Sequence, residues 1–276
     1  MANRKVVVIT RASSGVGHAT ARLLSQRDYK VFGTSRHPAN AEPIPTVEMV
    51  ALDVRADDSV AACVNAVLSR AGRLDVLINN AGYELAGASK EVSLEETKAQ
   101  FETNFFGVVR MVKAVLPFMR QQKHGQIINV SSLSGLTAIP FLGLYSANKF
   151  ALEGYTEALR HEVKPINILV SLIEPAFLKT PMMNNRQVAA ECMREYDLWQ
   201  QRALNAIRAY EEKAPGLELV AETVLEIIVH DRPRLRYVIG RQTKSITRLR
   251  RFLPEGVYEQ GARRNFWLDK HQGEAP

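Results

Sequence analysis

The sequence predicts an α/β fold in which a doubly wound parallel sheet of about seven strands carries helices on both faces. Apolar runs of strand length alternate along the chain with longer segments of helical period. The runs are nearly continuous in Val, Ile and Leu, as is typical of strands covered on both faces. With 276 residues, of which 46% are hydrophobic, residues 1–276 are expected to form one domain.

The expected strands and helices follow one another in regular order. The strand-length runs are 5–10, 30–35, 47–52, 75–79, 126–131, 166–173 and 237–240. The segments of helical period are 16–26, 59–70, 94–120, 145–162 and 217–229. Gly125 separates the third of these helices from the next strand, as expected of a residue that ends a helix.

Beyond residue 180 the pattern changes to apolar residues at steps of three and four. The residues of this stripe are Val188, Cys192, Tyr196, Trp199, Ala203, Ile207 and Tyr210. They predict one face of an amphipathic helix. Such a face most often packs on the body of a domain. The alternative is a lid over a substrate cavity.

The composition favours a cytoplasmic protein. The two cysteines, Cys63 and Cys192, are far apart and lack a metal-like spacing, so we expect neither a disulfide nor a metal site. We expect no signal peptide, and no segment approaches the roughly 20 apolar residues of a membrane span. The net charge is +7, with many arginines in 232–251. Because charge runs are usually solvated faces and no nucleic-acid module accompanies this one, we expect no nucleic-acid partner.

The segment VVVITRASSGVG at residues 6–17 contains a strand, a loop of small residues and the start of a helix. Backbone N–H groups at such a helix start can bind the pyrophosphate of a dinucleotide, whose charge the helix dipole favours. Gly15 and Gly17 carry no Cβ, so the backbone can closely approach the phosphate and the neighbouring strand. By itself the pattern also fits an ordinary tight turn.

The residue after the second strand bears on the choice of cofactor. NAD sites of this kind place a carboxylate about twenty residues after the glycine loop, where it binds the ribose 2′-hydroxyl. Here that region has Arg36 and no carboxylate before Glu42. Because an arginine can bind a 2′-phosphate that a carboxylate would repel, we expect NADP(H) to be preferred over NAD(H).

Tyr145 and Lys149 are four residues apart in a segment of helical character, so their side chains lie on one face about one turn apart. A phenol with a pKa of ~10 is a poor base at neutral pH, but a nearby cation favours the phenolate. Ser131 and Ser132 end the preceding strand, where reactive groups of parallel sheets gather. An isolated Tyr–Lys pair would be an ordinary surface pair, whereas this constellation predicts proton chemistry.

These motifs resemble those of the short-chain dehydrogenase/reductase family from residue 6 to about 240, with a looser C-terminal resemblance to steroid and retinol dehydrogenases and related ketone reductases. The resemblance implies a Rossmann-type fold and a catalytic tetrad of Asn104, Ser132, Tyr145 and Lys149. The residues that it and the loop pattern assign to the cofactor are Thr10, Arg11, Ser13, Ser14, Gly15, Val16, Gly17, Arg36, Asp53, Val54, Asn80, Ala81, Gly82, Tyr145, Lys149, Pro175, Phe177 and Thr180.

The resemblance also implies a role for each member of the tetrad. Ser132 would hold the substrate oxygen, and Tyr145 would donate or accept its proton. Lys149 would lower the pKa of the tyrosine and bind the nicotinamide ribose, and Asn104 would anchor a water in the proton relay. Hydride would pass directly between the nicotinamide and the carbinol carbon.

The segment after the sixth strand favours the lid. Residues 175–180 match the family segment that contacts the nicotinamide, so the chain that follows begins beside the reacting centre and 181–216 becomes the expected lid. The expected walls of the substrate pocket are Tyr83, Leu85, Leu133, Phe141, Leu142, Met182 and Met183. No arginine or lysine stands among them, so we expect a ketone or secondary alcohol on a bulky apolar substrate.

Two residues depart from the family pattern. Ala176 replaces a glycine after Pro175, which adds one methyl group. Arg11 replaces the first glycine of the loop, where a demanded glycine conformation would make any Cβ cost on the order of 1 kcal/mol. The Arg11 side chain can extend into solvent, contact a cofactor phosphate or obstruct the site; a tolerated or modestly weakening effect is favoured.

Other function classes remain open. Because of Arg11, the chain could be a catalytically weak or inactive NADP(H)-binding sensor, although a pure sensor would not need the tetrad. A hydrolase is disfavoured because the chain has no Gly-x-Ser-x-Gly nucleophile elbow. The family resemblance implies a homodimer or homotetramer.

Overall fold

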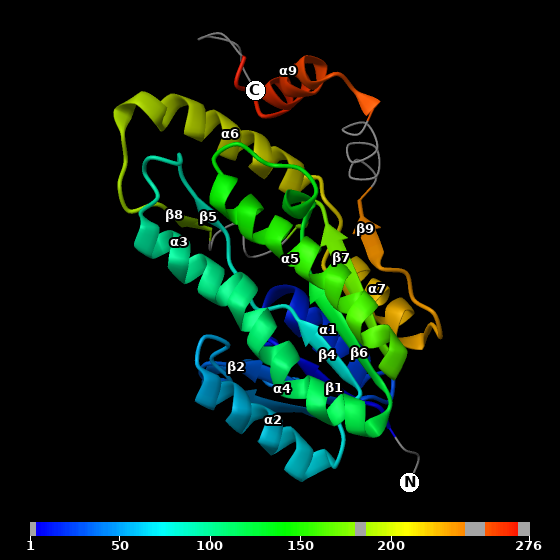
Figure 1. The fold of residues 1–276 in the computed structure, drawn as a ribbon. Coiled ribbons are helices and arrows are strands. Elements are labelled where there is room, and N and C mark those ends of the chain that lie inside the picture. The colour runs from blue at the N-terminus through cyan, green and yellow to red at the C-terminus, as the bar shows by residue number, and fades with distance from the viewer. Residues whose placement is uncertain (1–3, 180–185, 241–251, 270–276) are drawn as a thin grey trace.

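A single parallel sheet of seven strands forms the centre of the computed structural model, which describes residues 4–179, 186–240 and 252–269. Helices cover both faces of the sheet, which confirms the predicted doubly wound α/β fold (Figure 1). The strands lie in the order β3-β2-β1-β4-β6-β7-β9. Their bounds are β1 Val6–Ile9, β2 Lys30–Ser35, β3 Val47–Ala51, β4 Val76–Asn79, β6 Gly125–Val130, β7 Ile168–Pro175 and β9 Arg236–Ile239.

Alternate residues of the first strand enter two separate cores, because successive side chains of a strand point to opposite faces. Val6 and Val8 pack with the helices on one face, and Val7 and Ile9 pack with those on the other. The first face carries α2 (Asp57–Ala71), α4 (Gly107–Gln122) and α5 (Gly143–Val163), and the second carries α1 (Gly15–Ser25) and α7 (Glu218–Val229). Burial on both faces explains why the strands lack polar alternation.

The order of the strands creates a crevice at one edge of the sheet. β1 pairs with β2 on one side and with β4 on the other, so the direction of the strand order reverses between β1 and β4. In open parallel sheets ligands bind beyond the carboxyl ends of the strands at such a point. The loops after β1, β4 and β6 therefore meet where the glycine loop and the serines lie.

The predicted long helix 94–120 is interrupted. α3 (Leu94–Phe101) begins at Ser93, whose hydroxyl accepts from the Glu96 N–H while the Glu96 carboxylate accepts from the Ser93 N–H. A π-helical turn, η2 (Glu102–Phe106), then separates α3 from α4. Such turns cannot be read from hydrophobic period and often occur at functional sites. This one carries Asn104.

The predicted stripe from Val188 to Tyr210 is wrong at its start. β8 (Gln187–Val188) pairs in parallel with β5 (Leu85–Ala86), so Val188 belongs to a strand, and the helix α6 (Arg194–Glu212) begins only after Cys192. Pairing with β5 overrides the local helical period. Within α6 the buried residues are Gln200, Ala203, Ala206, Ile207 and Glu211, whereas Trp199 is 39% exposed.

The remaining elements are short or lie at the end of the chain. They are the 3-10 turns η1 (Pro38–Asn40), η3 (Leu133–Gly135) and η4 (Lys164–Ile166) and the helix α9 (Glu255–Asn265). In Figure 1, α9 lies beyond α6, at the far end of the molecule from the N-terminus. No helix within the described part of the chain is long and apolar enough to cross a membrane.

A partly buried cluster of ion pairs joins α5 to β7 and β9. Arg236 of β9 contacts Glu153 of α5 through Nε at 3.0 Å and the exposed Glu157 through Nη2 at 2.7 Å. The same Nε lies 3.2 Å from the fully buried Glu174 of β7. Burial, and then the neighbouring charge of Glu153, raises the pKa of Glu174 to about 8. The cluster thus contains a carboxyl group that holds a proton near neutral pH.

The raised pKa of Glu174 predicts a loss of stability with rising pH. The unfolded carboxyl has a pKa of about 4.3, so the folded state binds this proton more tightly, and its contribution is lost as the pH rises towards and through about 8. Between about pH 6 and pH 9, we expect the free energy of unfolding of the parent to fall by about 1–3 kcal/mol more than that of Glu174→Gln, because glutamine cannot ionise. Urea unfolding at several pH values measures this. Glu157→Gln, which removes an exposed partner of the same arginine, is the control, and equal pH slopes for Glu174→Gln and the parent would contradict the prediction.

Candidate active site

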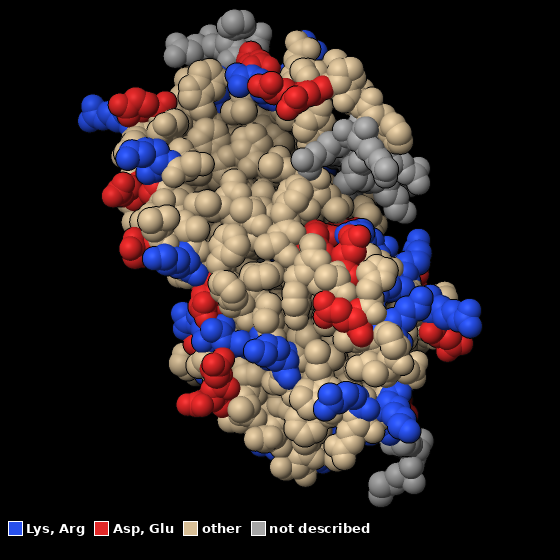
Figure 2. Space-filling view, viewed as in Figure 1, with Lys and Arg blue, Asp and Glu red and all other residues tan. Residues whose placement is uncertain are grey.

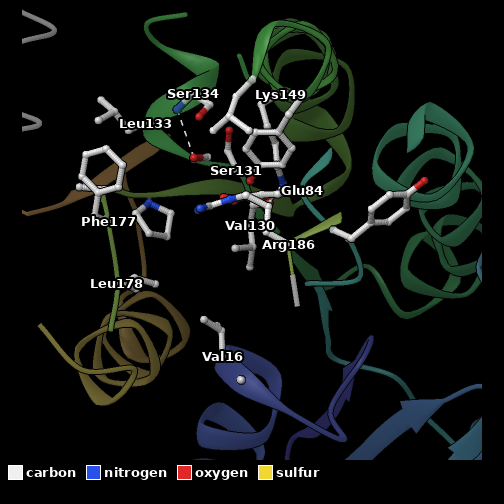
Figure 3. Close-up of a pocket in the computed structure, with 18 of the residues that line it drawn as sticks. Val16, Glu84, Val130, Ser131, Leu133, Ser134, Lys149, Phe177, Leu178 and Arg186 are labelled. Carbon is white, nitrogen blue, oxygen red and sulfur yellow. Dashed lines mark hydrogen bonds and ion pairs between the residues drawn. The ribbon is translucent and has the colours of Figure 1, made fainter. Parts of the chain in front are cut away.

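The helix α5 brings Tyr145 and Lys149 to a cavity at the carboxyl ends of β1, β4 and β6, which we call the Tyr145 cavity. Figure 3 shows Lys149, Ser131 and Ser134 around it. Tyr145 is 8% exposed and Lys149 is 6% exposed. Ser132, which follows β6, lines the same cavity, and its hydroxyl accepts from the Ser134 N–H at 3.1 Å. The structure therefore brings together three of the four residues of the predicted tetrad.

The side chain of Lys149 forms a hydrogen bond at the end of strand β6. Its Nζ donates to the Val130 carbonyl at 2.8 Å and lies 5.7 Å from the centre of the Tyr145 ring. This hydrogen bond fixes the ammonium between Tyr145 and the end of β6. Burial lowers the pKa of Lys149 to about 8, while the charges of Glu84 and Glu153 oppose the shift.

The pKa of Tyr145 differs in direction from the expectation. Burial raises it, the negative charge of Glu84 adds to the rise, and the Ser132 hydroxyl opposes it. Desolvation of the phenolate therefore outweighs the nearby cations. A raised pKa favours the neutral phenol, which is the form that can donate a proton.

Asn104 does not line the Tyr145 cavity. Its side chain clamps the backbone of Tyr83, accepting from the Tyr83 N–H at 3.0 Å and donating to the Tyr83 carbonyl at 2.9 Å. Its Nδ2 also lies 3.3 Å from Asn148 Oδ1 on α5. Asn104 thus joins the π-helical turn to α5 and to the segment after β4, and its predicted contact with a water stays a prediction.

The glycine loop has the shape that a dinucleotide needs. Gly15 has a φ of +58°, and a Cβ on Gly17 would collide with the Arg11 carbonyl oxygen and the Asn80 side chain. Ser14 and Val16 stand with Gly15 on the wall of the Tyr145 cavity, at the start of α1, whose first turn holds no acidic residue. Backbone N–H groups at a helix start and a first turn without acidic residues suit a pyrophosphate.

A second cavity adjoins the first, and we call it the Arg36 cavity. It lies beyond the ends of β2 and β3, and Arg11, Gly82 and Tyr83 border both cavities. The predicted cofactor residues that line it are Arg11, Ser13, Arg36, Asp53, Val54, Ala81 and Gly82. Asp53 forms an ion pair with Arg55 at 2.6 Å, and hydrogen bonds from Arg55 are the main reason that its pKa falls to about 2.

The other predicted cofactor residues fall into three groups. Those on the Tyr145 cavity are Ser14, Gly15, Val16, Asn80, Pro175 and Phe177, together with Tyr145 and Lys149. Thr10 and Gly17 line neither cavity. Thr10 is buried and accepts from the N–H groups of Asn80 and Ala81, each at 2.8 Å, so it joins the loops after β1 and β4. Thr180 lies outside the described residues.

Arg11 adopts the backbone conformation that favours glycine, with a φ of 53°. Its side chain does not extend into solvent. The guanidinium is half-buried and donates a hydrogen bond to the Gly82 carbonyl, at the border of the two cavities. Burial, and then the charge of Arg36, lowers the pKa of Arg11. Arg11 therefore stands where a dinucleotide would pass from one cavity to the other.

Some of the residues predicted to form the substrate walls line this cavity, and others do not. Tyr83, Leu133 and Leu142 line the Tyr145 cavity, whereas Leu85 and Phe141 do not. Leu85 packs with Val92 and Ala189 behind the cavity, because β5 pairs with β8. Phe141 has a φ of 59° in the turn before α5, and its carbonyl accepts from the Gly87 N–H. Met182 and Met183 lie outside the described residues.

Sequence reasoning missed three charged residues on the cavity wall, which are Glu84, Arg186 and Glu211. Their partners lie far apart in the chain, so no local pattern indicates them. It also missed the apolar Ile139, although Ile207 belongs to the predicted stripe. Arg186 adds to the wall a cationic side chain that was not among the predicted wall residues.

One group of metal-ligand side chains lies outside both cavities. Ligand atoms of Glu91, Cys192 and Asp197 lie within 4.8 Å of one another. Both Glu91 oxygens accept backbone N–H groups, and the Cys192 thiol donates to Asp197 at 3.0 Å. These side chains therefore have structural partners.

Comparison with known proteins covers most of the chain. Residues 5–191 match the family model for short chain dehydrogenase. A 3-ketodihydrosphingosine reductase of Bacteroides thetaiotaomicron is 38% identical over 262 residues, which span 94% of this chain and 97% of that protein. Retinol dehydrogenase 8 of Homo sapiens is 39% identical over 183 residues, which span 62% of this chain and 58% of that protein.

Solved structures of similar fold include complexes with both nicotinamide dinucleotides. A short-chain dehydrogenase from Streptomyces avermitilis has a TM-score of 0.80 at 28% identity and covers 94% of this chain and 97% of its own. ElxO with NADP bound has a TM-score of 0.72 at 25% identity, covering 88% and 99%. A Burkholderia phymatum short chain dehydrogenase/reductase in complex with NAD has a TM-score of 0.77 at 25% identity, covering 99% and 98%.

The position of Arg11 predicts a measurable effect on cofactor affinity. We expect Arg11→Gly to bind NADPH about tenfold more tightly, because a half-buried, hydrogen-bonded guanidinium no longer has to leave the border of the two cavities. Titration calorimetry with NADPH measures the dissociation constant. Arg11→Ala keeps a Cβ at positive φ but removes the guanidinium, so it separates obstruction from backbone strain. Weaker binding by Arg11→Gly, with a smaller salt dependence, would show instead that Arg11 binds a cofactor phosphate.

Proposed function

The chain belongs to the short-chain dehydrogenase family, and from that premise we propose that it is an NADP(H)-dependent oxidoreductase acting on a ketone or secondary alcohol of a bulky apolar substrate. The observation that carries this proposal is the convergence of Ser132, Tyr145 and Lys149 on one cavity beside the glycine loop. The resemblance noted in the sequence to this family is confirmed by the match of residues 5–191, and retinol dehydrogenase 8 is among its relatives.

Proton transfer is the task of the chain's own residues. The Ser132 hydroxyl would donate to the substrate carbonyl oxygen, and the neutral Tyr145 phenol would deliver the proton that this oxygen needs on reduction. When bound, the nicotinamide supplies or accepts the hydride at the carbinol carbon. Lys149, held by the Val130 carbonyl, would stabilise the phenolate left after proton transfer and bind the nicotinamide ribose.

An apolar substrate body fits the rest of the Tyr145 cavity. Leu133, Ile139 and Leu142 line it on the side of α5, and Ile207 lines it from α6. The stacking of Phe177 on Tyr210, with ring centres 5.1 Å apart, adds an aromatic contact between α6 and the end of β7. The position of α6 supports the proposal that 181–216 is a substrate lid. Two of the relatives are a retinol dehydrogenase and a 3-ketodihydrosphingosine reductase, and their names support the substrate class.

Arg36 supports a preference for NADP(H). It is exposed at the end of β2, on the wall of the Arg36 cavity, and the nearest carboxylate there, Asp53, already pairs with Arg55. A 2′-phosphate would therefore meet a cation that forms no ion pair with any carboxylate in the described part of the chain. From length and composition we also propose a single domain and a cytoplasmic location, and from the family resemblance a homodimer or homotetramer.

Removal of the Tyr145 hydroxyl tests the mechanism. We expect Tyr145→Phe to lose at least about 100-fold in kcat for reduction of a hydrophobic ketone with NADPH, because the ring remains but the proton donor is gone. Ketone-dependent NADPH oxidation measures the loss, and calorimetric titration with NADPH checks that the cofactor still binds. Tyr155→Phe, a similar change on α5 outside the cavity, is the control. Turnover by Tyr145→Phe equal to that of the parent would remove Tyr145 from the mechanism.

Reversal of the charge at residue 36 tests the cofactor preference. We expect Arg36→Asp to weaken NADPH binding about tenfold or more and to leave NADH binding weakened far less, because only NADPH carries the 2′-phosphate. The two dissociation constants, measured for both proteins, give the ratio. Arg27→Asp, at the end of the first helical segment and outside both cavities, controls for net charge. An unchanged ratio in Arg36→Asp would refute the assignment of Arg36.

A further inference from the structure

Three charged side chains form a chain of ion pairs on the wall of the Tyr145 cavity. Arg186 Nε donates to Glu84 Oε2 at 2.9 Å, and Arg186 Nη2 donates to Glu211 Oε1 at 2.6 Å. The side chains of Arg186 and Glu211 are 7% and 10% exposed, and that of Glu84 is 20% exposed. Figure 3 labels Glu84, Arg186 and Lys149 among the residues that line the cavity. We call these residues the Glu84–Arg186–Glu211 triad.

The triad holds more negative than positive charge. Two carboxylates face one guanidinium, and Glu211 Oε2 is buried without a hydrogen-bond partner among the described residues. Burial raises the pKa of Glu211, although Arg186 opposes the shift. A buried carboxylate whose charge is only partly balanced is unfavourable unless another cation approaches. The triad therefore favours a positively charged ligand.

Glu84 is the member of the triad that a ligand can reach. It is the most exposed of the three. Its negative charge adds to the rise in the pKa of Tyr145 and opposes the fall in the pKa of Lys149 that burial causes. Only one of its oxygens accepts from Arg186. A cation bound to the other oxygen would therefore lie close to the hydroxyl or carbonyl group that Tyr145 serves.

The other cations of the cavity do not remove this preference. Lys149 already donates to the Val130 carbonyl and Arg11 to the Gly82 carbonyl, and the negative charge of a bound dinucleotide would offset theirs. Arg186 donates through Nε to Glu84 and through Nη2 to Glu211. An anionic substrate that approached Arg186 would meet the negative charges of both carboxylates.

We propose that Glu84, positioned by Arg186 and Glu211, binds a protonated amine next to the reacting carbon, so that the substrates of this site are long-chain amino alcohols and the corresponding amino ketones. The ammonium would donate a charge-assisted hydrogen bond to the Glu84 oxygen that accepts none from the described residues, while Tyr145 and Ser132 hold the substrate oxygen. The apolar chain would lie against Leu142 and Ile207. This inference rests on the proposed oxidoreductase activity for its chemistry.

A comparison of substrates that differ mainly in charge tests the proposal. A long-chain vicinal amino alcohol and the vicinal diol of equal length are supplied with NADP⁺ near neutral pH, and NADPH formation gives kcat/KM for each. We expect the parent to favour the amino alcohol about tenfold or more, as one charge-assisted hydrogen bond allows. Glu84→Gln and Glu211→Gln should lower that ratio about tenfold, and Glu212→Gln, an exposed neighbour on α6, should leave it unchanged. Equal or poorer use of the amino alcohol by the parent would overturn the proposal.

A binding experiment separates this inference from the proposed function. A long-chain primary amine and the alcohol of equal length, neither of which has a secondary alcohol to oxidise, are titrated calorimetrically into the parent and into Glu84→Gln. Stronger binding of the amine that Glu84→Gln abolishes supports the cation site, even if no alcohol is oxidised and the proposed activity fails. Oxidation of the diol together with equal binding of amine and alcohol would leave the activity standing and refute the cation site.

Discussion

The burial of a polar helix face is the constraint on which this structure depends. α5 packs against the sheet with Tyr145, Asn148, Lys149 and Glu153 among its buried residues, and each buried polar group needs a partner. Partners come from every side: the Val130 carbonyl for Lys149, Asn104 for Asn148 and Arg236 for Glu153. Because these partners belong to β6, η2 and β9, the position of Tyr145 is determined by the whole sheet.

The same constraint explains the protonation states in the cavity. Burial raises the pKa of Tyr145 and lowers that of Lys149, so both groups are driven towards their neutral forms. A charged group that enters the cavity would therefore shift the pKa values of Tyr145 and Lys149 again. The nicotinamide, the cofactor phosphates and the substrate would each change the balance, and the structure offers separate side chains towards each of them.

Arg11 and the Glu84–Arg186–Glu211 triad are the two features of the site that the family resemblance does not predict. Arg11 accepts a strained backbone at φ 53° and places a cation at the border of the two cavities, where the family pattern has no side chain. The triad places charge where an apolar wall was expected. Both features stand on the walls of the cavities where the proposed cofactor and substrate would bind.

The sequence by itself determined the sheet, most of the helices and the Tyr145–Lys149 pair, because these depend on period and spacing within a few residues. Continuous apolar strands, the glycine loop and a four-residue separation have the same local meaning in any fold. The π-helical turn at Asn104, the pairing of β5 with β8 and the direction of the Arg11 side chain were decided only by the tertiary structure. Arg186 meets partners 102 and 25 residues away in the sequence. Such contacts depend on how distant segments pack, and no local pattern records them.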